Sequence, residues 1–181
     1  MTYALPPRDS GATYFFTLRL QDRTADTLVQ YVDVLRQSIR IARKRHPFEI
    51  TAAVVLPATL HMIWRLPIDD GNYSVRWRII KSTFSRHIPA PETAVQTESM
   101  KRRREKGIWR RGYWAHQIRD QTDYNLHEHL IIHAPVSAGL VTQPKDWALS
   151  SIHVRRATPL GTPGKPHVDL RKPQPFGATL F

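Results

Sequence analysis

Along this chain, apolar residues follow a strand-like pattern in some segments and a helical spacing of three or four positions in others. The order of these segments constrains the fold more than any other feature. Residues 13–20 alternate aromatic and β-branched side chains, and two further apolar runs, 48–56 and 60–66, are joined by a short turn. Runs of this kind are typical of strands. In residues 26–42 and 75–88 the apolar side chains instead recur every three or four positions, which indicates amphipathic helices. The order of elements to this point is β-α-β-β-α.

The second half of the chain adds one more strand and one more helix to this pattern. Residues 112–118 favour a fourth strand, and a third helix is expected to begin at Asp120 or Thr122, to run to about Ala134 and to stop at Pro135. Four strands with helices packed on one face predict an α+β fold of the ferredoxin-like or RRM-like type. Such a fold does not by itself indicate a function.

The charge of the chain narrows its class of partner. Twenty-seven Lys and Arg residues against fifteen Asp and Glu give a net charge of +12, which favours polyanions such as nucleic acid. The absence of cysteine excludes disulfides, thiolate nucleophiles and Cys-ligated zinc. No apolar run approaches the length of a membrane-spanning helix and no secretory leader is visible, so we expect a cytoplasmic protein with no membrane partner.

The positive charge is concentrated in one segment that also contains aromatic residues. Cations in this segment can neutralise phosphates, and aromatic rings can stack on unpaired bases, so the combination predicts a surface for single-stranded nucleic acid. The alternative is a solvated charged face beside ordinary core aromatics. The candidate DNA-binding residues are Lys101, Arg102, Arg103, Arg104, Lys106, Trp109, Arg110, Arg111, Tyr113 and Trp114.

The histidines give weaker signals of a metal site. His61 lies in the third predicted strand, where a packed, hydrogen-bonded histidine is more common than a metal ligand. The residue two positions before it, on the same face of the strand, is Thr59, so a second ligand is missing. His129 and His133 are spaced to share one helix face, but without a third spaced ligand an ordinary helix surface is the favoured interpretation.

Six sequence blocks together indicate a family relationship. The blocks are Gly11-Ala12-Thr13-Tyr14-Phe15-Phe16-Thr17, Leu56-Pro57-x-x-Leu60-His61, Ile80-Lys81-Ser82-x-Phe84-Ser85-Arg86, Gly107 to Asp120, Pro135-Val136-x-x-Gly139-Leu140-Val141, and Asp146-Trp147-x-x-Ser150-Ser151-x-His153. They resemble the REP-associated tyrosine transposases and stand in the order found in that family. We assign residues 8–156 to a domain of this type and residues 157–181 to a Pro/Gly-rich tail.

The resemblance implies an HUH-type nuclease that acts on single-stranded DNA. In such enzymes a His-hydrophobic-His motif on a central strand and a polar helix residue hold Mg²⁺ or Mn²⁺, and a helix tyrosine attacks the scissile phosphate. Families of this kind recognise hairpins formed by repetitive extragenic palindromes, so DNA is the implied partner.

Most of the implied catalytic positions carry other residues in this chain. The first metal-binding histidine falls on Thr59, and only His61 matches the motif. The tyrosine nucleophile falls on Leu130 and the polar ligand, four residues later, on Ala134. Leucine cannot form a phosphodiester and alanine cannot bind a cation, so we expect no intact catalytic site, a vestigial metal ligand in His61 and no bound cofactor.

These observations lead to one preferred function and two alternatives. The preferred one is a nucleoid-associated protein that binds hairpin or single-stranded DNA and has lost tyrosine-dependent cleavage. The first alternative is an active nickase in which Tyr124 is the nucleophile and His61 holds Mg²⁺ or Mn²⁺ together with His129 or His133. The second is an RRM-like RNA-binding protein that stacks bases on Phe15 or Phe16. The sequence leaves open whether the chain forms a homodimer.

Overall fold

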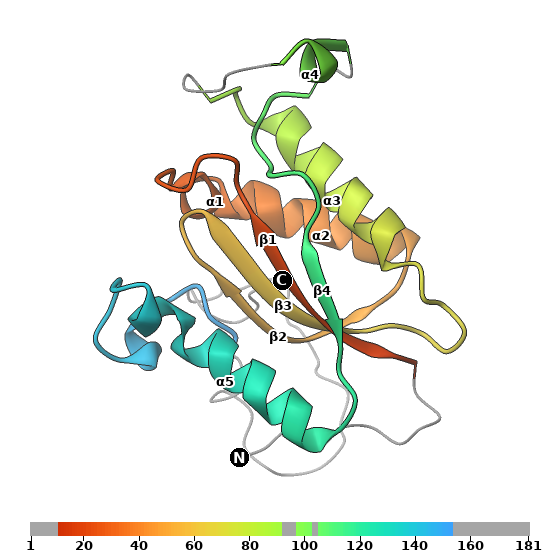
Figure 1. Ribbon diagram of the computed structural model, residues 1–181, viewed down its shortest axis with the longest axis vertical. Coiled ribbons are helices and arrows are strands. Elements are labelled where there is room, and N and C mark those ends of the chain that lie inside the picture. Colours follow the sequence, from red (N-terminus) through yellow and green to blue (C-terminus); the bar gives the residue numbers. More distant parts are fainter. Residues whose placement is uncertain (1–10, 92–96, 103–104, 154–181) are drawn as a thin grey trace, which may run out of the picture.

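The computed structural model describes residues 11–91, 97–102 and 105–153, and these residues form a four-stranded antiparallel sheet with helices on both faces (Figure 1). The strand order is β2-β3-β1-β4. The strands are β1 (Thr13–Arg19), β2 (Glu49–Val55), β3 (Thr59–Arg65) and β4 (Trp114–Gln117). The predicted α+β class and ferredoxin-like sheet are confirmed. β4 is shorter than the expected 112–118.

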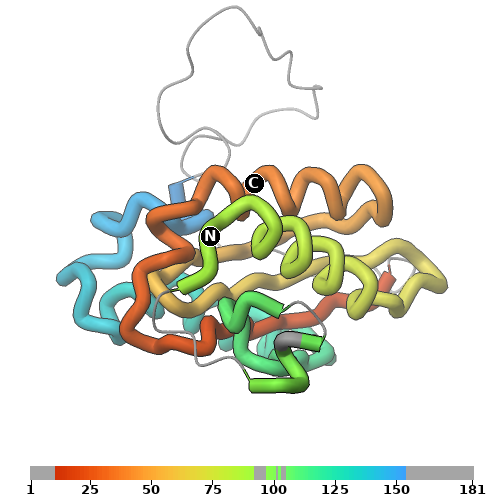
Figure 2. Tube along the Cα trace, turned by 90° about the horizontal axis from the view of Figure 1, so that it is seen from above, coloured from red at the N-terminus to blue at the C-terminus, as the bar shows by residue number. Residues whose placement is uncertain are grey.

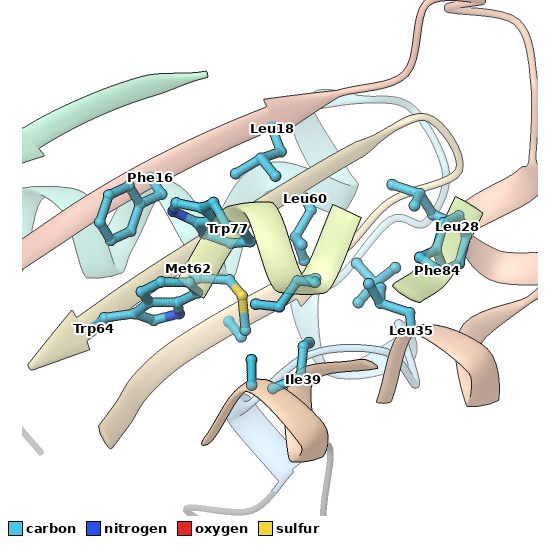
Figure 3. Packing of buried hydrophobic residues seen from close by; sticks show 14 of the residues in the cluster. Phe16, Leu18, Leu28, Leu35, Ile39, Leu60, Met62, Trp64, Trp77 and Phe84 are labelled. Carbon is cyan, nitrogen blue, oxygen red and sulfur yellow. The ribbon is translucent and has the colours of Figure 1, made fainter. Parts of the chain in front are cut away.

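One face of the sheet carries the larger core. The helices α2 (Val32–Arg45) and α3 (Tyr73–His87) lie side by side on this face, as Figure 2 shows from above. Their apolar stripes pack on alternate strand residues, and Trp64 of β3 stacks on Trp77 of α3 with ring centroids 4.0 Å apart (Figure 3). Burial of these large side chains supplies most of the driving force that holds the helices to the sheet.

The opposite face is covered by α5 (Gln121–Ser137), so the expectation that helices pack on one face holds for α2 and α3 but not for this third helix. Phe15 and Ile63 pack with Tyr124 and Ile131 of α5 in a second core. Side chains of neighbouring strand residues point to opposite faces, which is why Phe15 belongs to this core and Phe16 to the first one.

Two helix boundaries differ from those predicted. The helix expected from Asp26 is divided into α1 (Thr27–Gln30) and α2, because Tyr31 between them has a non-helical backbone (φ −109°, ψ 34°). α5 does not stop at Pro135 but continues to Ser137. Pro135 lacks the N–H that would bond to the carbonyl of Ile131, but it stands in the last turn, so the helix ends two residues later, and the Pro135 ring is buried.

Two shorter elements complete the described structure. A five-residue helix, α4 (Glu98–Arg102), follows α3, and the 3-10 helix η1 (Pro144–Asp146) follows α5. Beyond η1 the chain returns to the free edge of β2, where Trp147 donates its indole N–H to the carbonyl of Val55 at 2.9 Å. In the part of the chain that is described, no helix is both long and apolar enough to cross a membrane. The predicted tail, 157–181, and the domain boundary at 156 lie outside the described residues.

Candidate active site and nucleic-acid interface

The two strand positions that correspond to the histidines of the HUH motif, Thr59 and His61, lie on the face of the sheet that α5 covers. Thr59 and His61 are two residues apart on β3, so their side chains share this face with the buried Ile63. His61 pairs with Thr17 across the strands, and its Nδ1 lies 2.8 Å from the Thr17 hydroxyl. The ring of Phe15 stacks on the imidazole at 5.8 Å. These two contacts fix the orientation of the His61 imidazole, and the hydrogen bond occupies one of its two ring nitrogens.

The environment of His61 keeps its imidazole neutral. Burial lowers the pKa of His61 from 6.5 to about 4, and the positive charge of Arg19 lowers it in the same direction. Both effects disfavour the protonated ring. At neutral pH the side chain is therefore an uncharged group that is hydrogen-bonded to its neighbour on β1.

The residues at the other implied catalytic positions offer no nucleophile and no strong ligand. Leu130 and Ala134 are four residues apart on α5, with Leu130 exposed (43%) and Ala134 buried in the second core. Thr59 contributes only a neutral hydroxyl. Of the positions that would hold the family's divalent ion, His61 alone carries a good ligand, so this donor set does not fit such an ion.

Tyr124, the nucleophile of the first alternative, is completely buried in the second core. A nucleophile must meet a phosphate from solvent, so this placement argues against Tyr124 unless α5 moves. The rings of His129 and His133, the other candidate ligands, contact each other in a tilted arrangement, with centroids 4.1 Å apart. Their pairing is consistent with the ordinary helix surface favoured above.

β4 leads directly into α5 (Figure 1), and a group of potential ligands that the sequence did not single out lies at this junction. His116 of β4 and Asp123 and His127 of α5 bring one donor atom each within 4.8 Å of one another. Among the described residues this is the only group of three such side chains. The Asp123–His127 spacing of four residues on one helix was a visible signal, but His116 joins the group only through the fold.

The basic and aromatic residues of the 101–114 segment separate in space. Trp109 and Tyr113 pack against the first core, and Trp114 is 53% exposed. Trp114 pairs with Thr17 across the strands and so lies on the α5 side of the sheet. The aromatic rings therefore do not form a single stacking surface.

The cations of this segment fall into three groups. Arg102, Arg110 and Arg111 are exposed, and Lys106 is half-buried and donates to the carbonyl of Ile88 at 2.6 Å. Arg103, Arg104 and the side chain of Lys101 lie outside what the structure describes.

An open cavity of about 980 Å³ lies between α3 and residues 105–113. Gly107 and Gly112 have φ near +71°, a backbone conformation that favours glycine and turns the loop at both ends. Burial lowers the pKa of Lys81 in the cavity wall, against the opposing charge of Glu105, and its ammonium lies 5.8 Å from the Trp109 ring centroid. The cations lining the cavity are Arg78, Lys81, Arg86, Lys106, Arg110 and Arg111.

Comparison with known proteins identifies the family. No family model matches the chain, but a protein of Haemophilus influenzae is 38% identical over 143 residues, covering 79% of this chain and 81% of its own length. One of Escherichia coli K12 is 37% identical over 143 residues, covering 79% and 78%. Both carry the name REP-associated tyrosine transposase. The chain belongs to the REP-associated tyrosine transposase family.

The fold agrees with this family. A solved structure of a REP-associated tyrosine transposase bound to a REP hairpin superposes with a TM-score of 0.68 at 34% identity. The match covers 91% of this chain and 93% of that one, so the architecture is shared over nearly the whole length. The solved structure of this relative thus confirms the α+β arrangement of sheet and helices that the sequence predicted.

Proposed function

We propose that this protein binds hairpin or single-stranded DNA through the basic cavity between α3 and residues 105–113, and that it does not cleave DNA through a tyrosine. The observation that carries the first part is the clustering of six cations around one cavity. The solved relative, which is bound to a REP hairpin, supports the same partner class. A protein of this kind is expected to associate with the nucleoid.

The cavity presents exposed cations on a loop that is held against α3. Arg110 and Arg111 are exposed, so their guanidinium groups can reach phosphates without a large desolvation cost. Lys81 donates to the carbonyl of Arg110 at 3.2 Å, which fixes the path of the loop against α3. A cavity wall lined by cations, with two exposed guanidinium groups on the loop, suits a bulky, highly charged ligand such as a DNA stem or its flanking strand.

Neutralising the loop cations should weaken hairpin binding. We expect Arg110→Gln/Arg111→Gln to reduce affinity for a palindromic DNA hairpin about tenfold at low salt and to flatten the salt dependence by roughly two counterions, as measured by fluorescence anisotropy. Arg40→Gln, which removes an exposed charge from α2, is the matched control and should have a much smaller effect. Equal losses in both variants, or binding that does not weaken as salt rises, would contradict the proposed interface.

The proposed loss of cleavage follows from the replacement of three implied catalytic residues by Thr59, Leu130 and Ala134. With Mn²⁺ and hairpin DNA carrying a single-stranded flank, the natural chain should form no covalent protein–DNA adduct on a denaturing gel. Thr59→His/Leu130→Tyr/Ala134→Asn restores the family's chemistry at all three positions and should form one. An adduct with the natural chain that disappears in Tyr124→Phe would establish the Tyr124 alternative instead.

The RNA-binding alternative loses its main support. It required Phe15 or Phe16 to present a ring to solvent, but they are only 2% and 0% exposed. Both rings are needed in the two cores, so neither can stack on a base.

A further inference from the structure

The junction of β4 and α5 brings two imidazoles and a carboxylate to one point. His116 Nε2 lies 2.9 Å and 3.0 Å from the two carboxylate oxygens of Asp123, and His127 Nδ1 lies 3.0 Å from Oδ1 of the same carboxylate. The two histidine rings are stacked with centroids 4.6 Å apart. Nitrogen and oxygen ligands bound at about 2.1 Å to one ion lie roughly 3.0–3.4 Å from each other. The separations from the carboxylate are therefore close to those of a coordinated ion.

Neighbouring groups hold these donors in place. The backbone N–H of Arg119 donates to Asp123 Oδ2 at 3.0 Å, and the N-cap residue Asp120 accepts from the N–H of Asp123 at 2.8 Å. Phe15 packs on His127 with ring centroids 4.7 Å apart, and Trp114 stacks on His116 at 5.6 Å. Such outer contacts are what orient the ligands in metal sites.

The site combines partial burial with a path to solvent. The side chains of Asp123 and His127 are each 10% exposed, whereas that of His116 is 25% exposed. The more exposed imidazole of His116 thus lies on the solvent side of a mostly buried carboxylate, so an ion can approach the donors from the side of His116.

We propose that His116, Asp123 and His127 form a binding site for a divalent ion of the Zn²⁺ class, which joins β4 to the first turns of α5. Two imidazoles and one carboxylate favour Zn²⁺, Co²⁺ or Ni²⁺ over Mg²⁺, which prefers oxygen ligands. The site uses none of Thr59, His61, Leu130 or Ala134, so it is separate from the positions implied for cleavage. It also stands independently of the proposed DNA binding.

Metal binding at this site must displace existing hydrogen bonds. His127 Nδ1 lies 2.8 Å from the backbone carbonyl of Asp123, so its N–H is bonded there when no ion is bound. Coordination moves that proton to Nε2 and gives up the bond to the carbonyl. Histidine ligands must be unprotonated, so the affinity should fall as the pH is lowered.

The test uses the full chain without DNA. Titration with Co²⁺ should give visible absorption bands that saturate at one ion per chain, and Zn²⁺ should displace the Co²⁺ and raise the melting temperature. Asp123→Asn, which preserves the shape of the side chain, and His127→Ala should each weaken Zn²⁺ binding at least about tenfold in calorimetry. His133→Ala removes another histidine of α5 and is the matched control, which should bind as tightly as the natural chain.

Three results would overturn this proposal. They are the absence of one-to-one Co²⁺ or Zn²⁺ binding by the folded natural chain, unchanged affinity in Asp123→Asn, and loss of binding in His133→Ala. If His127→Ala does not fold, as judged by circular dichroism, the isosteric Asp123→Asn decides the question. None of these measurements involves DNA, so failure here leaves the proposed hairpin binding untouched, and the reverse also holds.

Discussion

His61 lies between a hydroxyl on the neighbouring strand and an aromatic ring, and this setting determines its protonation. The hydrogen bond to Thr17 at 2.8 Å and the stacked Phe15 ring leave little water around the imidazole. A strand histidine in such a place contributes to packing whether or not it binds a ligand. The apolar neighbours of His61 in the sequence already favoured a packed, hydrogen-bonded histidine. The absence of a second histidine at position 59 gave a further reason not to expect a metal ion there.

The lowered pKa of His61 predicts a pH-dependent stability. Because the pKa of this imidazole is about 4 in the folded chain and 6.5 when its surroundings do not perturb it, the unfolded chain binds the proton more tightly. The stabilisation is complete above pH 6.5 and is lost as the pH falls towards 4, with a maximum loss of roughly 3 kcal/mol. Urea unfolding across this range should show a shallower decline in His61→Gln than in the natural chain. Parallel profiles for the two proteins would contradict this prediction.

At the scale of elements, one buried arginine ties α3 to the connection between α2 and β2. The side chain of Arg76 is 1% exposed, and its guanidinium donates to the carbonyls of His46 and Pro47 at 3.2 and 2.8 Å. It also donates to both carboxylate oxygens of Asp70, at 3.1 and 2.6 Å. A buried guanidinium needs all of these partners, because an unsatisfied charge inside the protein is costly.

Removing the charge of Asp70 should destabilise α3 in a pH-dependent way. We expect Asp70→Asn to lower the free energy of unfolding by about 1–2 kcal/mol at pH 7, a modest value because the Asp70 side chain is 36% exposed and partly screened. The hydrogen bond from Arg76 lowers the pKa of Asp70 from 3.8 to about 2, so its contribution is present above pH 4 and lost as the pH falls through 2. The two chains should therefore converge in stability at that pH.

Urea denaturation at pH 7 and near pH 2 provides this measurement. The matched control is Asp69→Asn, which changes an exposed neighbour in the same turn and should have little effect at either pH. Asn tolerates the positive φ of 60° at position 69, so the control introduces no backbone strain. A loss in Asp69→Asn equal to that in Asp70→Asn would assign the effect to general charge rather than to the Arg76 pair.

At the scale of the whole molecule, the sheet separates the two regions for which a function is proposed. The basic cavity belongs to the face with α3, whereas His61 and the His116, Asp123 and His127 group belong to the face with α5. A four-stranded sheet that is covered on both sides keeps these regions apart, so a chain can lose residues on one face while the other face persists. The electrostatic field of a chain with net charge +12 extends beyond either face and attracts DNA. We expect the rate of association with DNA to fall as the salt concentration rises.

The sequence by itself determined the strands, the two helices of the first core and the family, because apolar spacing and motif blocks are local properties of the chain. It did not predict that α5 covers the second face or that it passes through Pro135, since a helix face is chosen by the partner it packs against. The basic segment was visible as charge, but only folding placed Trp109 and Tyr113 against the core and Trp114 on the other side of the sheet. In the group of His116, Asp123 and His127, the sequence shows only the four-residue spacing of Asp123 and His127 on one helix, and the packing of α5 beside β4 adds His116.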